Sequence, residues 1–142
     1  MKRAFHLAFP VDDLEKTVGF YHGLLGCRVG RTASLWVDFE FFGNQITAHL
    51  KPEACTNAKE NKVDGDDVPV RHFGAILEWA EWEGLAQKLE AAGQEFVIGP
   101  KIRFKGKPGE QGTFFVRDPA GNALEFKAFR TPDKVFETGE IK

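Results

Sequence analysis

An internal repeat constrains the fold of this chain more than any other feature. His6 and His72 lie 66 residues apart, and two glycines that end helical patterns, Gly26 and Gly93, lie 67 apart. In each half, an alternating apolar stretch precedes an amphipathic helical stretch, and three more alternating stretches follow. The sequence therefore predicts two βαβββ units, each too small to close a core of its own.

The predicted fold class is α+β, with two βαβββ repeats whose sheets form a half-open barrel. We expect one domain over 1–142, with repeats at 4–51 and 70–129, a polar linker or surface loop at 52–69 and a C-terminal tail at 130–142. Expected strands cover 4–11, 27–32, 34–42, 45–51, 70–78, 94–98, 112–117 and 124–129, and expected helices cover 14–25 and 82–92. Residues 99–111 are expected to form a basic loop, which holds the extra length of the second repeat.

Composition narrows the class of protein. The 142 residues carry a net charge of −2, and the near-balance of charges argues against bulk nucleic-acid or membrane-surface binding. The N-terminal residues lack an apolar signal-peptide core, and no stretch reaches the length of a membrane span. Two cysteines do not suggest a disulfide framework. The expectation is a cytoplasmic protein that acts on a small molecule.

Four chemically capable side chains share one phase of the predicted strands. His6, His49, His72 and Glu125 all lie opposite the apolar residues of their strands, so helices on the apolar faces would leave them on the other face. Each histidine alone has a plain alternative as a hydrogen-bonded strand residue, and Glu125 alone as an exposed strand carboxylate. Their agreement in phase and repeat position favours a metal site inside the barrel. Imidazoles with a carboxylate suit Fe2+, Mn2+, Zn2+ or Ni2+.

The closing stretch Asp118-Pro119-Ala120-Gly121-Asn122-Ala123-Leu124-Glu125, with His6 and His72, gives the chain a recognisable pattern. It resembles the vicinal oxygen chelate superfamily, which includes glyoxalase I, extradiol dioxygenases, fosfomycin-resistance transferases and bleomycin-resistance proteins. The resemblance implies that His6, His72 and Glu125 hold a divalent metal, with His49 as a fourth ligand or an acid–base group. It also implies a homodimer and a substrate that chelates the metal.

Departures from the family pattern rank the possible reactions. His49 stands where glyoxalase I has a second carboxylate, which disfavours a lyase or isomerase reaction. Phe115 stands where extradiol dioxygenases, and often fosfomycin transferases, have a tyrosine, and a phenyl ring cannot donate a hydrogen bond. The leading hypothesis is a dioxygenase-like oxidoreductase, with Fe2+ as the favoured metal. A glyoxalase- or epimerase-like enzyme and a non-catalytic ligand-sequestering protein are the alternatives.

Four residues are candidates for substrate binding. Arg103 lies in the basic stretch and could hold an anionic substrate, although a solvated loop explains the same charges. Thr113 and Phe115 share the predicted pocket phase of their strand, and Trp36 could wall the pocket from the first repeat. The expected substrate is therefore small, apolar and anionic.

Overall fold

The computed structural model describes residues 3–55, 59–63 and 65–139, with backbone alone at 59–62. The chain forms two compact units, one from Met1–Asn57 with Arg117–Asn122 and the other from Ala58–Val116 with Ala123–Lys142. The boundaries follow the predicted repeats, except that the Asp-Pro turn of the second repeat belongs to the first unit.

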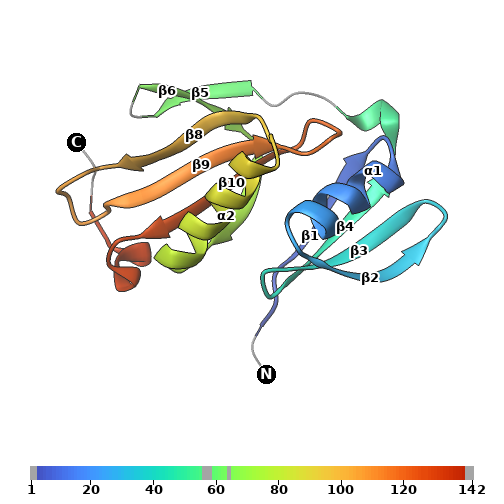
Figure 1. Cartoon of the computed structure of the whole chain (residues 1–142), viewed down its shortest axis with the longest axis horizontal. Coiled ribbons are helices and arrows are strands. Elements are labelled where there is room, and N and C mark those ends of the chain that lie inside the picture. Colours follow the sequence, from blue (N-terminus) through green and yellow to red (C-terminus); the bar gives the residue numbers. More distant parts are fainter. Residues whose placement is uncertain (1–2, 56–58, 64, 140–142) are drawn as a thin grey trace. The chain divides into compact units, whose positions relative to one another are not determined.

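The first unit is a four-stranded sheet covered by one helical segment (Figure 1). Its elements are β1 (His6–Val11), α1 (Leu14–Val18), the π-helical η1 (Gly19–Leu24), β2 (Arg28–Ala33), β3 (Trp36–Phe41), β4 (Asn44–Leu50) and the short 3-10 helix η2 (Pro52–Ala54). The strand order is β1-β4-β3-β2, with β1 parallel to β4 and the other pairs antiparallel. Asp13 caps α1 by accepting a hydrogen bond from the Lys16 amide.

The core of the first unit surrounds Tyr21, which is fully buried. Its ring lies 5.6 Å from Phe9 and 5.2 Å from Phe39, so the helical segment packs on the apolar face of the sheet. The Tyr21 hydroxyl donates to Asp118 at 2.8 Å, and Asn122 donates to the Pro10 carbonyl at 2.9 Å. These bonds attach the Asp-Pro turn to β1 and to the helix.

The second unit repeats this topology and adds a hairpin. Its elements are β5 (Lys59–Val63), β6 (Asp66–Val70), β7 (His72–Ile76), α2 (Trp79–Ala91), β8 (Phe96–Arg103), β9 (Gln111–Arg117), β10 (Ala123–Phe129) and the 3-10 helix η3 (Pro132–Phe136). The main sheet has the order β7-β10-β9-β8, with β7 parallel to β10, and β5 pairs only with β6 in the described residues. The strand order matches that of the first unit.

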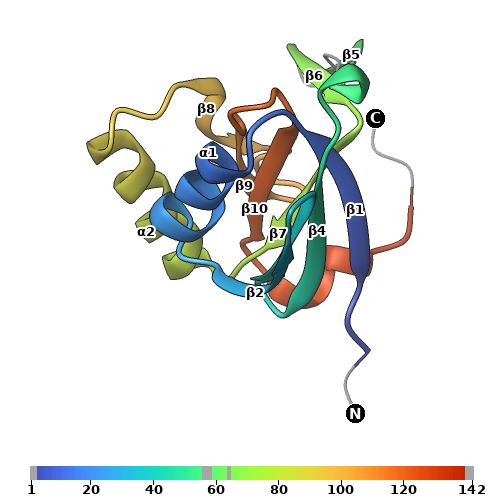
Figure 2. The same cartoon turned by 90° about the vertical axis from the view of Figure 1, so that its right-hand side faces the viewer.

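Helix α2 and the hairpin cover different sides of the second sheet (Figure 2). Trp82 stacks on Phe114 and donates its indole N–H to the Phe126 carbonyl at 3.0 Å, which fixes the helix on one face. On the opposite face, Val68 of β6 packs with Ile98 and Phe115. The hairpin therefore buries part of the face that the sequence assigns to the site.

Three sequence predictions about local structure were wrong. Residues 59–63 and 66–70 form strands where a polar linker was expected, because β6 buries Val68 against the sheet. β8 continues to Arg103 through part of the expected basic loop, with a register shift between Ile98 and Lys101 at Gly99-Pro100. The expected polar tail contains the 3-10 helix η3.

The α+β class and the two-repeat architecture are confirmed, and neither four-stranded sheet closes into a barrel. Within the described ranges, no helix has the length and hydropathy that crossing a membrane requires.

Candidate functional site

The centre of the candidate site is a pair of side chains on the paired strands β7 and β10. The Nε2 atom of His72 lies 3.1 Å from Oε1 of Glu125. The strand register places His72 opposite Ala123 and Glu125 opposite Gly74, so the carboxylate reaches back by one pleat to meet the ring. Both side chains are largely covered, with exposed fractions of 29% and 13%. They therefore interact with little screening by water.

The other ring nitrogen of His72 is held by the backbone. Nδ1 lies 2.5 Å from the carbonyl oxygen of Pro69 at the end of β6, so Nδ1–H donates and Nε2 faces Glu125. The hydrogen bond to Glu125 raises the pKa of His72, against the opposing effect of burial, and the Pro69 carbonyl adds to the rise. In the metal-free chain, the His72 ring is therefore biased toward the imidazolium form.

Glu125 is fixed from a second direction. The hydroxyl of Thr113, which is fully buried on β9, donates to Oε2 at 2.6 Å, and the Lys127 ammonium lies 4.0 Å from Oε1. Burial would raise the pKa of Glu125, but the hydrogen bonds from His72 and Thr113, together with Lys127, lower it overall. The carboxylate is therefore ionised and held with Oε1 toward His72.

Phe115 forms an apolar wall beside this pair. Its ring meets that of His72 edge-on, with centroids 4.9 Å apart, and only 1% of its surface is exposed. Val68 of the hairpin also packs against it. Thr113 and Phe115 were predicted to bind substrate, and the structure places both beside the His72–Glu125 pair.

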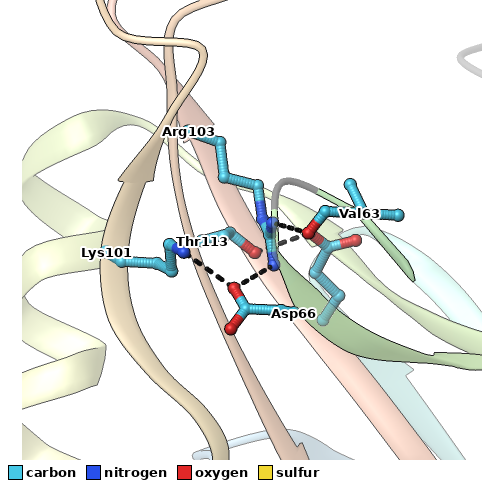
Figure 3. Close-up of polar contacts among 6 residues, drawn as sticks. Val63, Asp66, Lys101, Arg103 and Thr113 are labelled. Carbon is cyan, nitrogen blue, oxygen red and sulfur yellow. Dashed lines mark hydrogen bonds and ion pairs between the residues drawn. The ribbon is translucent and has the colours of Figure 1, made fainter. Parts of the chain in front are cut away.

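A cluster of charges fastens the hairpin to the sheet (Figure 3). Asp66 accepts a hydrogen bond from Lys101 at 2.7 Å and one from Arg103 at 3.0 Å, and Arg103 also donates to the Val63 carbonyl at 2.7 Å. We call Asp66, Lys101 and Arg103 the hairpin latch. Lys101 lies opposite Thr113 in the register, so the latch is on the same sheet face as Glu125.

The latch changes the role of Arg103, which was predicted to hold an anionic substrate. Its side chain is 3% exposed, and its guanidinium is engaged by Asp66 and by the backbone of Val63. The hydrogen bond from Lys101 lowers the pKa of Asp66, and both cations add to that shift while burial opposes it. Arg103 therefore anchors the hairpin that carries Pro69, the residue that orients His72.

Sequence reasoning missed Asp66 and Pro69, because the segment that holds them was assigned to a linker. A signal was available in the dipeptide Asp64-Gly65, since an Asp-Gly pair is typical of a tight hairpin turn.

The first unit carries the structural counterparts of these positions. His6 lies opposite Gln45 and Ala8 opposite Thr47, as His72 lies opposite Ala123 and Gly74 opposite Glu125. Thr47 is therefore the counterpart of Glu125, and it donates to the carboxylate of Asp38 on β3 at 2.6 Å. The same hydroxyl–carboxylate bond is present in both units, with the two partners exchanged between strands.

The register places His49 two residues from the counterpart of Glu125. His49 lies opposite Pro10 and is the counterpart of Lys127, not of Glu125. It is four residues along β4 from the partner of His6, which is about 13 Å at the rise of a strand. This distance argues against His49 as a ligand of a metal held by His6. Trp36 is the cross-strand partner of His49 and is partly exposed.

The donor chemistry of the second unit fits two positions of a divalent-metal site. An imidazole nitrogen oriented by a backbone carbonyl and a carboxylate oxygen oriented by a hydroxyl converge within 3.1 Å. Within either unit, the described residues contain no group of three His, Cys, Asp or Glu side chains placed to hold a metal. His6 is exposed on the equivalent face of the first unit and stays a predicted third ligand.

Comparisons with known proteins identify the family of the chain. The sequence profile of the Glyoxalase/Bleomycin resistance protein/Dioxygenase superfamily matches residues 3–126. A glutathione transferase FosA from Serratia marcescens is 25% identical over 129 residues, covering 84% of this chain and 76% of FosA.

Two crystal structures share the fold. A glyoxalase/bleomycin resistance protein/dioxygenase from Alicyclobacillus acidocaldarius is 30% identical, with a TM-score of 0.76 and coverage of 94% of this chain and 96% of that one. The fosfomycin resistance protein FosX from Listeria monocytogenes is 18% identical, with a TM-score of 0.69 and coverage of 94% and 98%. The chain therefore belongs to the glyoxalase/bleomycin resistance protein/dioxygenase superfamily, the group that includes the vicinal oxygen chelate enzymes.

Proposed function

We propose that this chain is a divalent-metal-dependent enzyme whose leading activity is dioxygenase-like oxidation of a small, apolar, anionic substrate. The observation that carries the proposal is the His72–Glu125 pair, with Nδ1 of His72 bound by Pro69 and Oε2 of Glu125 bound by Thr113. Such outer hydrogen bonds orient metal ligands in proteins. An ordinary surface ion pair does not need them.

His72 and Glu125 would hold the metal, and we propose His6 as the third ligand. A bound divalent metal supplies a Lewis acid for two adjacent substrate oxygens and, as Fe2+, the redox chemistry for dioxygen. Phe115 supplies an apolar wall beside His72, and Lys127 supplies a positive charge 4.0 Å from Glu125. These two groups support the choice of an apolar substrate with an anionic oxygen.

The proposed reaction needs no external reductant, because both atoms of dioxygen are inserted into the substrate as its carbon–carbon bond is cleaved. Proton transfer would fall to groups at the edge of the site, and we propose that the exposed His49 exchanges protons with solvent there and does not touch the metal-bound part of the substrate. A lyase reaction that depends on two carboxylates has less support, because the counterpart of Glu125 in the first unit is Thr47.

A second candidate is glutathione-dependent group transfer, which the 25% identity with FosA favours. Phe115 counts against it, since it offers no hydroxyl to a polar substrate. A non-catalytic sequestering protein has no need of the oriented His72–Glu125 pair. The likeness to bleomycin-resistance proteins keeps that function as a third candidate.

The first experiment measures metal binding by the wild type, His72→Ala and Glu125→Ala, each titrated with Mn2+. We expect both substitutions to weaken binding by more than about 100-fold, because each removes a ligand. Matched controls are His22→Ala, whose ring is hydrogen-bonded to the Cys27 carbonyl in the first unit, and Glu95→Ala on the surface. Equal binding by all five proteins would overturn the metal-site proposal.

The second experiment separates the reactions with the Fe2+-loaded protein. Oxygen uptake with a panel of substituted catechols tests the leading activity, and glutathione consumption with an epoxide or with methylglyoxal tests the alternatives. Oxygen uptake that Glu125→Ala abolishes would support the dioxygenase. Glutathione consumption without oxygen uptake would reverse the ranking, and Mn2+ binding without turnover of any substrate would favour sequestration.

A further inference from the structure

A separate pocket of about 480 Å³ lies in the second unit, between the β8–β9 loop and the C-terminal segment. Its walls include Phe104 and Pro108 from the loop, Gln111 and Phe129 from strand ends, and Val135 from η3. This volume suits a small organic molecule, and the exposed lining is mostly apolar. His72, Glu125 and the hairpin latch do not line this pocket.

Gln111 gives the pocket wall an unpaired hydrogen-bond acceptor. Its side-chain oxygen is buried and has no hydrogen-bond partner in the described part of the chain. Buried polar atoms of this kind are rare in folded proteins, because each one left unpaired destabilises the fold. Gln111 lines the pocket, so turning its amide toward the cavity would let a ligand with an O–H or N–H group satisfy the oxygen.

Backbone strain at Phe104 is a second observation at this pocket. Its φ of 53° lies in the left-handed region, which a bulky side chain rarely adopts. The preceding residue, Arg103, is held by Asp66 and Val63, and the Lys107 amide donates to the Phe104 carbonyl at 3.0 Å. The latch and the loop therefore keep the Phe104 ring at the pocket wall at a cost in backbone energy.

The loop is also tied to the far end of β10. Glu110 accepts a hydrogen bond from the Gly106 amide at 3.1 Å, and its carbonyl accepts one from the Arg130 amide at the same distance. Lys134 at the rim is paired with Glu137 at 3.0 Å. The walls are thus built before a ligand arrives, and Glu137 pairs with Lys134, one of the two lysines in the lining, while Lys107 is the other.

We propose that this pocket binds a neutral one- or two-ring aromatic molecule whose hydroxyl or N–H group donates to Gln111. The aromatic and aliphatic walls suit the rings, and the buried oxygen selects a ligand with a donor over one of the same shape without it. Gln111 lies two residues before Thr113 on β9, about 7 Å along the strand, so the pocket is on the site face of the sheet but outside the metal site.

The test compares two probes that differ in one group. 2-Naphthol carries a hydroxyl donor, whereas 2-methoxynaphthalene has the same rings and no donor. We expect the wild type to bind 2-naphthol about tenfold more tightly, the usual effect of one net hydrogen bond. Gln111→Leu should remove this preference, and Gln94→Leu, at a partly exposed position outside the pocket, should keep it. Amide chemical shifts measured by NMR should change at Phe104, Gln111 and Val135.

Two further variants fill the pocket. Val135→Trp should abolish binding of both probes, while Phe136→Trp should leave it unchanged, because Phe136 is 90% exposed and is not part of the lining. Pro108→Trp, on an exposed loop position, is the substitute if Val135→Trp does not fold. Binding should also persist in Glu125→Ala, which separates this pocket from the metal site. Equal affinities for the two probes, or binding that survives both pocket-filling variants, would overturn the proposal.

Discussion

The two repeats use the same strand order to support different chemistry. In the first unit the carboxylate that accepts a hydrogen bond from a hydroxyl is Asp38 on β3, and in the second it is Glu125 on β10. β3 is separated from the histidine strand β1 by β4, whereas β10 lies directly beside the histidine strand β7. At about 4.8 Å between strands, this exchange decides whether a carboxylate can reach the histidine.

The comparison shows how one fold can hold a structural pair in one copy and the proposed ligand pair in the other. Thr47 and Asp38 are both buried and bonded to each other, so they contribute to the sheet. Glu125 keeps one oxygen for Thr113 and turns the other to His72. The hairpin adds the second difference, because its Pro69 orients the histidine of the second unit.

The largest effect is expected for an alanine at Gly74, the counterpart of Ala8 in the first unit. A Cβ at Gly74 would lie 1.5 Å from the Glu125 carbonyl oxygen, so Gly74→Ala must push β7 and β10 apart. We expect a loss of about 3 kcal/mol or more in the free energy of unfolding, measured by urea denaturation. Gly84→Ala is the control, because it meets open space on α2 and should stabilise by about 0.5–1 kcal/mol. An unchanged free energy of unfolding in Gly74→Ala would contradict the close approach of these strands.

The next prediction releases the hairpin latch. Asp66→Asn leaves the buried Arg103 without its counter-charge, and we expect a loss of about 2 kcal/mol, reduced from the value for a fully buried pair because Asp66 is 29% exposed. Mn2+ affinity should fall by about tenfold, since Pro69 then orients His72 less well. Asp133→Asn, exposed on η3, should change neither quantity.

The latch also predicts a pH dependence. The pKa of Asp66 is lowered in the folded chain, so its contribution is present above the unfolded value near 4 and disappears as pH falls through the folded value. The stability difference between the wild type and Asp66→Asn should therefore shrink on acidification below about pH 4. A constant difference across this range would show that the Asp66 charge is not what holds the hairpin.

A third prediction concerns His72, whose contribution to stability should fall with rising pH while metal affinity increases. Its pKa is raised in the metal-free chain, so its stabilising contribution is complete below about pH 6.5 and is lost as pH rises through the folded value. Metal must displace the same proton, so Mn2+ affinity should increase by up to tenfold per pH unit over that range. Calorimetric titrations in buffers of different ionisation enthalpy should detect the released proton. Affinity independent of pH would argue against His72 as a ligand.

The smallest expected effect comes from exchanging the partners of the first unit. The double variant Asp38→Thr with Thr47→Glu gives β4 the carboxylate and β3 the hydroxyl, as in the second unit. We expect the pair to cost about 1 kcal/mol, and Thr47→Glu alone to cost more, because two adjacent buried carboxylates repel. A double-mutant cycle measures the coupling. If the double variant is no better than Thr47→Glu alone, the two units do not share this bond.

The sequence determined the repeat, the order of the predicted strands and the sheet face of His72 and Glu125. Alternation with a period of two residues assigns each side chain to a face, and the apolar phase faces the helix in both units. That information was enough to place Thr113, Phe115 and the His72–Glu125 pair on one face of the second sheet.

Only the tertiary structure decided how far along the strand each residue lies. Residues two apart on a strand point to the same face but lie at different positions along the strand. The alternation of the sequence therefore could not distinguish His49 from Thr47 as the counterpart of Glu125. The hairpin and the role of Arg103 were missed for the same reason. A charged strand that is buried by a segment distant in sequence has the composition of a solvated loop. These features depend on which distant strands pair with one another, and the alternation of a sequence does not encode that pairing.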